Sequence, residues 1–153
     1  MFLFLHAPTA IALTEQIQNP LFAFIIGAAS HFLTDFIPHG DRQADEYLAT
    51  FPPRRRTISL AIMGAIDSLL LVFTLSTIFN AIPATPQALA AVAGSIAPDY
   101  LWGLHEITRW KFLDGYRKFH AWFQSFRGKD VPFWVGIAYQ TLLAFLLIIY
   151  ITK

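Results

Sequence analysis

The sequence predicts an all-α protein that forms a polytopic helical bundle in a membrane. Of its 153 residues, 56% are hydrophobic and only 14% are charged, whereas soluble domains carry about a quarter charged residues. The hydrophobic residues gather in long runs, which prolines and clusters of Arg and Lys separate. This length and composition predict a single integral membrane domain, residues 1–153, with four transmembrane helices.

The composition also excludes several classes of protein. The sequence has no Cys, so it has no disulfide framework, no Cys-bound zinc and no thiol nucleophile. A formal net charge of +1 gives no reason to expect nucleic acid as a partner. A glycine-rich phosphate loop, a Gly-x-Ser-x-Gly elbow and a His-Glu-x-x-His pair are all absent from the sequence, which removes the usual nucleotide-binding, serine hydrolase and zincin interpretations.

Four apolar runs approach the roughly 20 helical residues that cross about 30 Å of hydrocarbon. Prolines or charges bound each run, and both end helices. The runs are residues 21–36, 57–79, 87–104 and 132–151.

The segment before the first run, residues 1–17, is apolar but contains His6 and Pro8. It could cross the membrane, insert partly or lie at the interface. We expect no secretory signal, because no basic residue precedes the apolar stretch. Pro8 and Pro20 both favour helix starts, with a polar tip between them, so the pattern predicts a helical hairpin with the first span. In that hairpin His6 and His31 would meet at the same membrane depth.

Basic residues are concentrated in two of the connections. Residues 38–56 hold four arginines and residues 105–131 hold six basic residues, whereas residues 80–86 hold none. Both basic connections are therefore expected on the cytoplasmic side of an inner membrane. The six basic residues of the second connection are Arg109, Lys111, Arg117, Lys118, Arg127 and Lys129.

The second basic connection also contains an amphipathic stretch, residues 105–126. Apolar residues and one His recur there at helical spacing, and basic residues mostly occupy other directions. Such a helix lies in the membrane interface. It would either anchor the bundle on anionic lipid or cover a site at the cytoplasmic surface.

Ionisable residues inside apolar runs are costly, so they mark candidate functional positions. His31 and Asp35 lie four residues apart on one helical face, and His39 and Asp41 follow in the turn after Pro38. His and carboxylate ligands together suit zinc, manganese or iron better than calcium. The same residues could instead pair with each other and cap the turn, so a metal site and a structural network both stay open.

The third predicted span carries a second group of this kind. Pro98 interrupts helical hydrogen bonding with the carbonyl of Gly94, and a bend at membrane depth faces protein or a wet cavity. Asp99 at this bend is either a ligand that reaches His31 and Asp35 or a cap for broken backbone.

Four other polar residues have more than one interpretation. Asp67, deep in the second span, could orient a ligand, pair with a serine or make an unrelated polar contact. His105 and Glu106 could join a site or mark the membrane boundary. His120 could fold back over the site as a ligand or lie among lipid headgroups.

These residues resemble a family of small bacterial inner-membrane proteins described as metal-dependent hydrolases, which is distantly grouped with the zinc-dependent phospholipase C and single-strand nuclease superfamily. The matching features are His6, the stretch from Gly27 to His39, the stretch from Gly94 to Asp99, and Phe119-His120. The resemblance implies a divalent metal site, with zinc expected, that hydrolyses a phosphoester, including a lipid phosphoester, at the cytoplasmic membrane surface.

The resemblance also implies roles for individual residues. The implied metal ligands are His6, His31, Asp35 and Asp99, and the further ligands or general bases are His39, Asp41 and His120. Arg42 and Arg117 would hold a phosphate or a lipid headgroup.

The sequence departs from that family at two of the matched positions. A lone His120 stands where many members have His-Arg-Gly-x-Thr-His-Ser, and Tyr100 follows Asp99 where members often continue Asp-x-Asp-His. Fewer ligands imply one metal ion rather than several, or a site without catalysis. Two alternatives are a non-enzymatic membrane protein whose His and Asp cluster is a structural polar network, and a proton or ion path through Asp67 and Asp99. The sequence predicts no oligomeric state.

Overall fold

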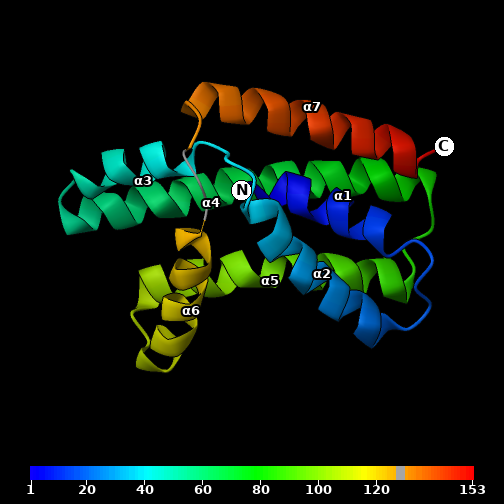
Figure 1. Ribbon diagram of the computed structural model, residues 1–153, viewed down its shortest axis with the longest axis horizontal. Helices are drawn as coiled ribbons and strands as arrows, with labels where there is room; N and C mark the ends of the chain where they lie inside the picture. Colours follow the sequence, from blue (N-terminus) through cyan, green and yellow to red (C-terminus); the bar gives the residue numbers. More distant parts are fainter. Residues whose placement is uncertain (127–129) are drawn as a thin grey trace.

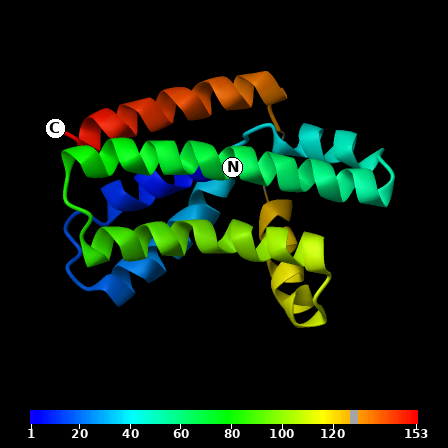
Figure 2. The same cartoon turned by 180° about the vertical axis from the view of Figure 1, so that it is seen from behind.

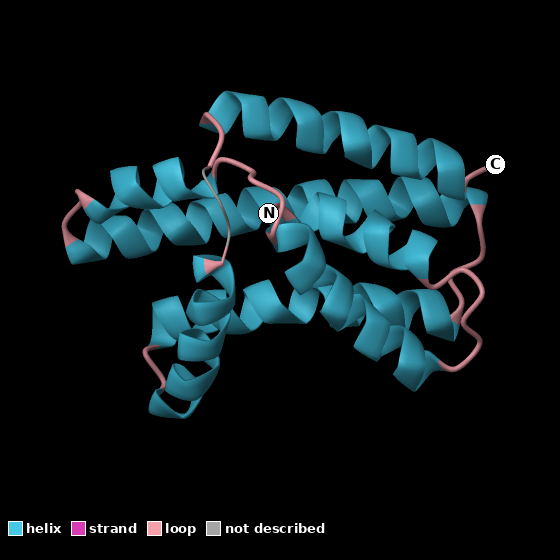
Figure 3. Cartoon of the chain, in the orientation of Figure 1, coloured by secondary structure: helices cyan, strands magenta, loops and turns pink. Residues whose placement is uncertain are grey.

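The computed structural model describes residues 1–126 and 130–153, and within these ranges the chain forms helices and no strand (Figure 3). The all-helical class is therefore confirmed. Arg127 and Lys129, two of the basic residues of the second connection, lie outside the described residues. The helices are α1 (Leu3–Leu13), α2 (Pro20–Asp35), α3 (Asp41–Ala49), α4 (Pro53–Ala81), α5 (Pro86–Thr108), α6 (Asp114–Ser125), which follows the 3-10 turn Lys111–Leu113, and α7 (Phe133–Ile151) (Figure 1).

Two of the described helices are long and apolar enough to cross a membrane, α4 with 29 residues and α7 with 19. Both expose large apolar side chains. Phe73 on α4 is 72% exposed and Trp134 on α7 is 76% exposed, and contiguous apolar surface of this kind indicates contact with lipid or another apolar partner. Because α1 and α2 are shorter apolar helices, the arrangement with four transmembrane helices stays a prediction.

The first helix, α1, lies in the interior of the bundle. It contacts α2, α4, α5 and α7, and Figure 2 shows it behind α4, between α7 and α5. Residues 14–19 turn the chain so that α2 packs back on α1, as the predicted hairpin requires. The 11 residues of α1 span about 16 Å at 1.5 Å per residue. Residues 1–17, for which the sequence left three locations open, therefore contain an interior helix that is too short to cross a bilayer by itself.

Polar side chains from two other helices cap the N-terminal end of α1. The N–H of Leu3 donates to Asp67 Oδ2 on α4 at 2.9 Å, and the N–H of Phe2 donates to Gln140 Oε1 on α7 at 3.0 Å. The first N–H groups of a helix have no acceptor within it, and a carboxylate there also interacts favourably with the helix dipole. Of the roles considered for Asp67, the observed contact is thus with the backbone of α1.

The backbones of α2 and α5 approach closely where a glycine on each helix faces the backbone of the other. A Cβ on Gly27 would lie 2.2 Å from the carbonyl oxygen of Ala91, and a Cβ on Gly94 would lie 2.1 Å from the carbonyl oxygen of Phe24. Small residues allow such close packing between membrane helices. The approach brings together the next turn of each helix, and these turns carry the candidate ligands.

The helix α3 lies in a segment that the sequence predicts to be a connection. Its start is held from the other end of the chain, because the carboxylate of Asp130 accepts the N–H groups of Gly40 at 2.7 Å and Arg42 at 3.0 Å. Gly40 has a φ of +85°, a conformation that glycine adopts at little cost. The side chain of Leu48 on α3 is buried. The helix lies beside the N-terminal half of α4 (Figure 1).

The boundary between α5 and the interfacial helix also differs from the prediction. α5 stays helical through Pro98 and continues to Thr108, so that His105 and Glu106 belong to it. The amphipathic helix proper is α6, which begins nine residues after His105, at Asp114. It packs against α5 rather than standing apart from the bundle.

Candidate metal centre

Four side chains from three helices converge inside the bundle. They are His31 and Asp35 on α2, Asp99 on α5 and His120 on α6, and we call them the His/Asp centre. One ligand atom from each lies within 4.8 Å of the others. His31 Nε2 is 3.4 Å from Asp35 Oδ2 and 3.6 Å from Asp99 Oδ1, and His120 Nε2 is also 3.6 Å from Asp99 Oδ1.

Several polar atoms of the His/Asp centre are buried and have no hydrogen-bond partner within the described part of the chain. These atoms are Nε2 of His31, Oδ2 of Asp35, and both ring nitrogens of His120. A buried polar atom without a partner costs about 1–3 kcal/mol. Neutral imidazole nitrogens and carboxylate oxygens are also the donor atoms that zinc-type ions accept, so this group could hold a metal ion.

Hydrogen bonds behind the centre fix the orientation of two imidazole rings. His31 Nδ1 donates to the carbonyl of Ser95 at 2.9 Å, which leaves Nε2 with the lone pair that faces the carboxylates. The hydroxyl of Thr34 donates to the carbonyl of Ser30 at 2.9 Å and therefore accepts from His6 Nδ1, also at 2.9 Å. Contacts of this kind orient metal-ligating histidines in general.

The predicted ligands lie close together, with one difference in the set. His31, Asp35 and Asp99 are in the His/Asp centre, whereas His6 lies beside it. The rings of His6 and His31 stack with centroids 4.1 Å apart, as the predicted hairpin requires, and His6 Nε2 is 3.4 Å from Asp35 Oδ1. His120 joins His31, Asp35 and Asp99 in this group and is buried over the site instead of lying among headgroups.

The helix α6 reaches the centre through its aromatic face. Its Tyr116 hydroxyl donates to the carbonyl of Pro98 at 2.8 Å, one residue before Asp99. Burial raises the pKa of Tyr116 above its ordinary value, as do the charges of Asp99 and Asp35, so the hydroxyl stays protonated. The ring of Phe32 on α2 lies among Phe119, His120 and Phe123, which closes this side of the centre.

His39 and Asp41 lie next to the centre, around the amino group of Met1. This group is 3.0 Å from Asp35 Oδ1, 2.8 Å from His39 Nε2 and 2.9 Å from Asp41 Oδ2. Burial would lower the pKa of the amino group, but the neighbouring carboxylates outweigh burial and raise it to about 11. Burial would likewise raise the pKa of Asp41, but the amino group and His39 hold it well below its usual range.

The backbone of His39 rests directly on α7. A Cβ on Gly136 would lie 2.1 Å from the carbonyl oxygen of His39, and Gln140 Nε2 donates to the same oxygen at 3.2 Å. The neighbouring residue, Gly40, has its Cα opposite Phe133 at a distance that leaves no room for a Cβ. These contacts hold the His39 turn against the bundle.

The remaining polar candidates are not part of the centre. His105 and Glu106 form a second cluster at the end of α5, and Arg117 lines a cavity beside them. Arg42 is exposed and pairs with Glu46 at 3.5 Å, and it is not among the residues that line this cavity. Sequence reasoning did not single out Thr34 or Gln140, although each is a polar side chain inside an apolar run.

The fold and the site together define a class of protein. It is an all-helical protein with two candidate membrane spans and a buried group of two His and two Asp that could hold a metal ion. Comparisons with family models, with curated proteins and with solved structures find no match for this chain. The family resemblance drawn from the stretch Gly27 to His39 therefore stays a prediction.

Proposed function

We propose that this protein is a metal-dependent hydrolase that cleaves a phosphoester at the cytoplasmic face of an inner membrane. The observation that carries the proposal is the convergence of four side chains, three of them buried, several of whose ligand atoms have no hydrogen-bond partner in the described ranges. Two imidazoles and two carboxylates match the ligand types and number of zinc sites, so zinc is the ion we propose.

The four side chains differ in exposure, and this difference suggests where a substrate approaches. The side chain of Asp99 is 24% exposed, whereas those of His31, Asp35 and His120 are almost fully buried. A phosphoester would therefore approach from the side of Asp99. A bound zinc-type ion supplies an acidified water and a Lewis acid for a phosphoryl oxygen.

His39 and Asp41 are the candidates for moving a proton. His39 Nδ1 donates to the carbonyl of Ile37 at 2.6 Å, which leaves Nε2 as the nitrogen that accepts a proton. Nε2 lies 2.8 Å from both Asp41 Oδ2 and the amino nitrogen of Met1, so a proton taken up there has a carboxylate beside it. An imidazole with such a partner suits general acid and base catalysis.

The orientation of the protein follows from its basic connections. Residues 38–56 and the basic residues around α6 would lie on the cytoplasmic side. The His/Asp centre takes two of its side chains from the last turns of α2, just before residues 38–56, and one from α6 itself. The substrate would then reach the centre from the cytoplasmic membrane surface, with membrane lipid as the surrounding partner.

Metal analysis of the purified full chain tests the proposal. We expect one zinc-type ion per chain in the wild type and in Asp45→Ala, which removes an exposed carboxylate on α3. His31→Ala and Asp35→Ala should each lose the ion, because each removes a ligand. Wild-type protein that binds no metal after exposure to zinc, manganese and iron would overturn the proposal.

Hydrolysis is tested separately with bis(p-nitrophenyl) phosphate in detergent and in vesicles. We expect activity that a chelator removes and zinc restores, and that Asp35→Ala lacks. Metal binding without hydrolysis would contradict the enzymatic part of the proposal.

The main alternative is a non-enzymatic protein in which the polar cluster holds the helices together. The ion pairs of the Met1 amino group with Asp35 and Asp41 favour it. It predicts a metal-free wild type, and it predicts that His31→Asn combined with Asp35→Asn folds and functions nearly normally. The ion-path hypothesis predicts instead that Asp67→Asn lowers proton or ion flux in proteoliposomes.

A further inference from the structure

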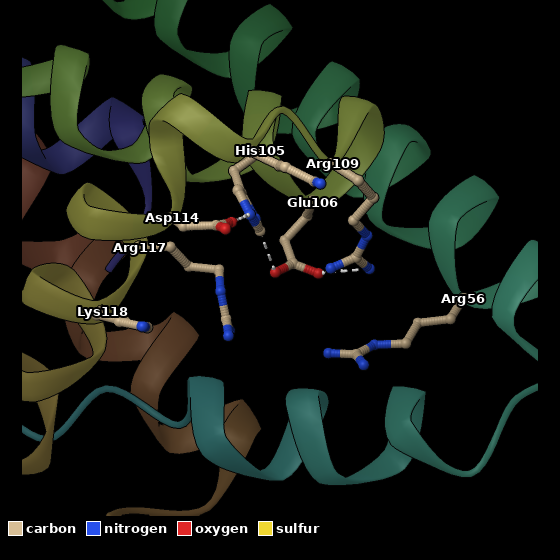
Figure 4. Close-up of a pocket in the computed structure, with 8 residues that line it drawn as sticks. Arg56, His105, Glu106, Arg109, Asp114, Arg117 and Lys118 are labelled. Atoms are coloured by element: carbon tan, nitrogen blue, oxygen red, sulfur yellow. Dashed lines mark hydrogen bonds and ion pairs between the residues drawn. The ribbon is translucent and has the colours of Figure 1, made fainter.

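A second polar cavity, of about 330 Å³, opens beside the C-terminal end of α5. Residues from α4, α5 and α6, and from the turn between the last two, line it (Figure 4). We call it the basic cavity, because most of its lining side chains are cationic. The cationic residues are Arg56, Arg109, Lys111, Arg117 and Lys118.

The two carboxylates of the basic cavity already have partners within the protein. Glu106, whose side chain is only 5% exposed, pairs with Arg109 at 2.9 Å. His105 Nε2 donates to Asp114 Oδ1 at 2.8 Å, and its Nδ1 is 3.6 Å from Glu106 Oε1. These contacts give each carboxylate a partner and hold Arg109 against the wall of the cavity.

The other cations are left with no protein anion. Five cationic and two anionic side chains give the cavity a net charge of +3 when His105 is neutral. Within the described ranges, Arg56, Arg117 and Lys118 form no ion pair, and Nε of Arg56 is buried without a hydrogen-bond partner. Figure 4 shows the guanidinium groups of Arg56 and Arg117 extending into the same space from opposite sides.

The backbone at Arg109 also points to a functional site. Arg109 has a φ of +56° and is the one non-glycine residue with positive φ in the described part of the chain. A left-handed conformation at a non-glycine residue costs about 1 kcal/mol or more, and such residues cluster at ligand-binding sites. The conformation ends α5 and sets Arg109 beside the carboxylate of Glu106.

We propose that the basic cavity binds a phosphate group, either as free phosphate or as part of a lipid headgroup. Three guanidinium groups line it, and the planar guanidinium matches two phosphate oxygens at once. Its volume is within the range of small-ligand sites, about 300–1,000 Å³. The net positive charge favours an anion, and the buried Nε of Arg56 lacks an acceptor. A phosphate group supplies both the charge and the acceptor oxygens.

The basic cavity is separate from the His/Asp centre but close to it along two helices. His105 follows Asp99 by six residues on α5, about 9 Å of helix, and Arg117 precedes His120 by three residues on α6. The two sites share no side chain. Phosphate binding in the basic cavity can therefore be tested on metal-free protein, independently of hydrolysis.

The test uses the full chain in detergent with a chelator present, and inorganic phosphate as the first probe. We expect calorimetric titration to show phosphate binding to the wild type and to Arg54→Gln, whose exposed side chain lies outside the cavity. Arg117→Gln and Arg56→Gln should each weaken binding about tenfold, since each removes a charge-assisted hydrogen bond. Unchanged thermal unfolding of these variants confirms that they are folded.

The second arm distinguishes the two sources of phosphate. The chain is reconstituted into phosphatidylcholine nanodiscs with or without phosphatidic acid, and bound phosphatidic acid is measured by mass spectrometry. Arg117-dependent retention of phosphatidic acid identifies a lipid headgroup, and Arg117-dependent binding of inorganic phosphate alone identifies the free ion. If neither probe binds, or if both bind Arg117→Gln and Arg54→Gln equally, the proposal is wrong.

Discussion

Replacing Gly94 with Ala is expected to move α2 away from α5 and to weaken metal binding at the His/Asp centre. The added Cβ would lie 2.1 Å from the carbonyl oxygen of Phe24 and 3.0 Å from the amide nitrogen of Ala28. Both neighbours are backbone atoms and have no rotamer that relieves the contact. Ordinary van der Waals contact begins at 3.4 Å, so the two helices have to separate by about 1 Å.

This displacement is large compared with the tolerance of a metal site. Zinc lies about 2.0–2.2 Å from nitrogen and oxygen ligands, and a functional site keeps these distances to within about 0.2 Å. If His31 on α2 and Asp99 on α5 move apart by about 1 Å, they can no longer both reach one ion at these distances. We expect metal affinity to fall at least tenfold, and the free energy of unfolding to fall by about 1–3 kcal/mol from overpacking.

The same substitution at Gly103 is the matched control, because it lies on the same helix with open space around it. Gly103→Ala should keep wild-type metal affinity and gain up to about 1 kcal/mol from helix propensity. The assay is an equilibrium zinc titration of each purified protein, together with thermal unfolding followed by circular dichroism. If Gly94→Ala retains both wild-type affinity and wild-type stability, close packing of α2 on α5 does not determine the ligand geometry.

Asp67→Leu removes the acceptor for the N–H of Leu3 and should lower the free energy of unfolding by about 1 kcal/mol, whereas Asp67→Asn keeps an acceptor oxygen and should unfold near the wild-type temperature. Asp130→Ala removes the carboxylate that accepts backbone N–H groups at the start of α3, so hydrogen exchange should accelerate in α3 and stay slow in α7. Thr34→Val removes the hydroxyl that orients the ring of His6 and should weaken zinc binding about tenfold in the same titration.

Each of these three outcomes has a contrary result. Equal stability of Asp67→Leu and the wild type would contradict the capping contact on α1. Unchanged exchange of α3 in Asp130→Ala would contradict the role of that carboxylate. Wild-type zinc affinity in Thr34→Val would mean that His6 takes no part in the metal site.

The candidate ligands could largely be predicted because charged residues are few in the apolar runs. His31 and Asp35 share a helical face, and Asp99 follows a glycine and a proline that mark an unusual stretch of helix. The sequence left open whether His120 reaches these residues. This depends on how α6 folds back after the turn Lys111–Leu113, and a sequence pattern carries no information on that direction.

Other parts of the structure could not be predicted, because no pattern in the nearby sequence indicates them. α3 buries one side chain, Leu48, among its nine residues, so its apolar periodicity is weak, and Asp130, far along the chain, holds its start. The basic cavity likewise has no motif, because Arg56 comes from α4 and the other cations come from around α5 and α6. Asp67 has no polar partner near it in the sequence. Its partner is the N–H of Leu3 in the first turn of α1, and the sequence does not show that this turn packs against α4.

The capping of α1 by α4 and α7 has a consequence for biosynthesis. The N–H of Phe2 is satisfied by Gln140, which a ribosome adds on the order of 10 s later at about 5–20 residues per second. A buried N–H group without an acceptor costs about 1–3 kcal/mol, so α1 cannot complete its packing in the bundle before α7 has been made. Although α1 is made before the other described helices, it is thus among the last of them to reach its native position, and nascent chains that stop before α7 should leave it open to chemical labelling.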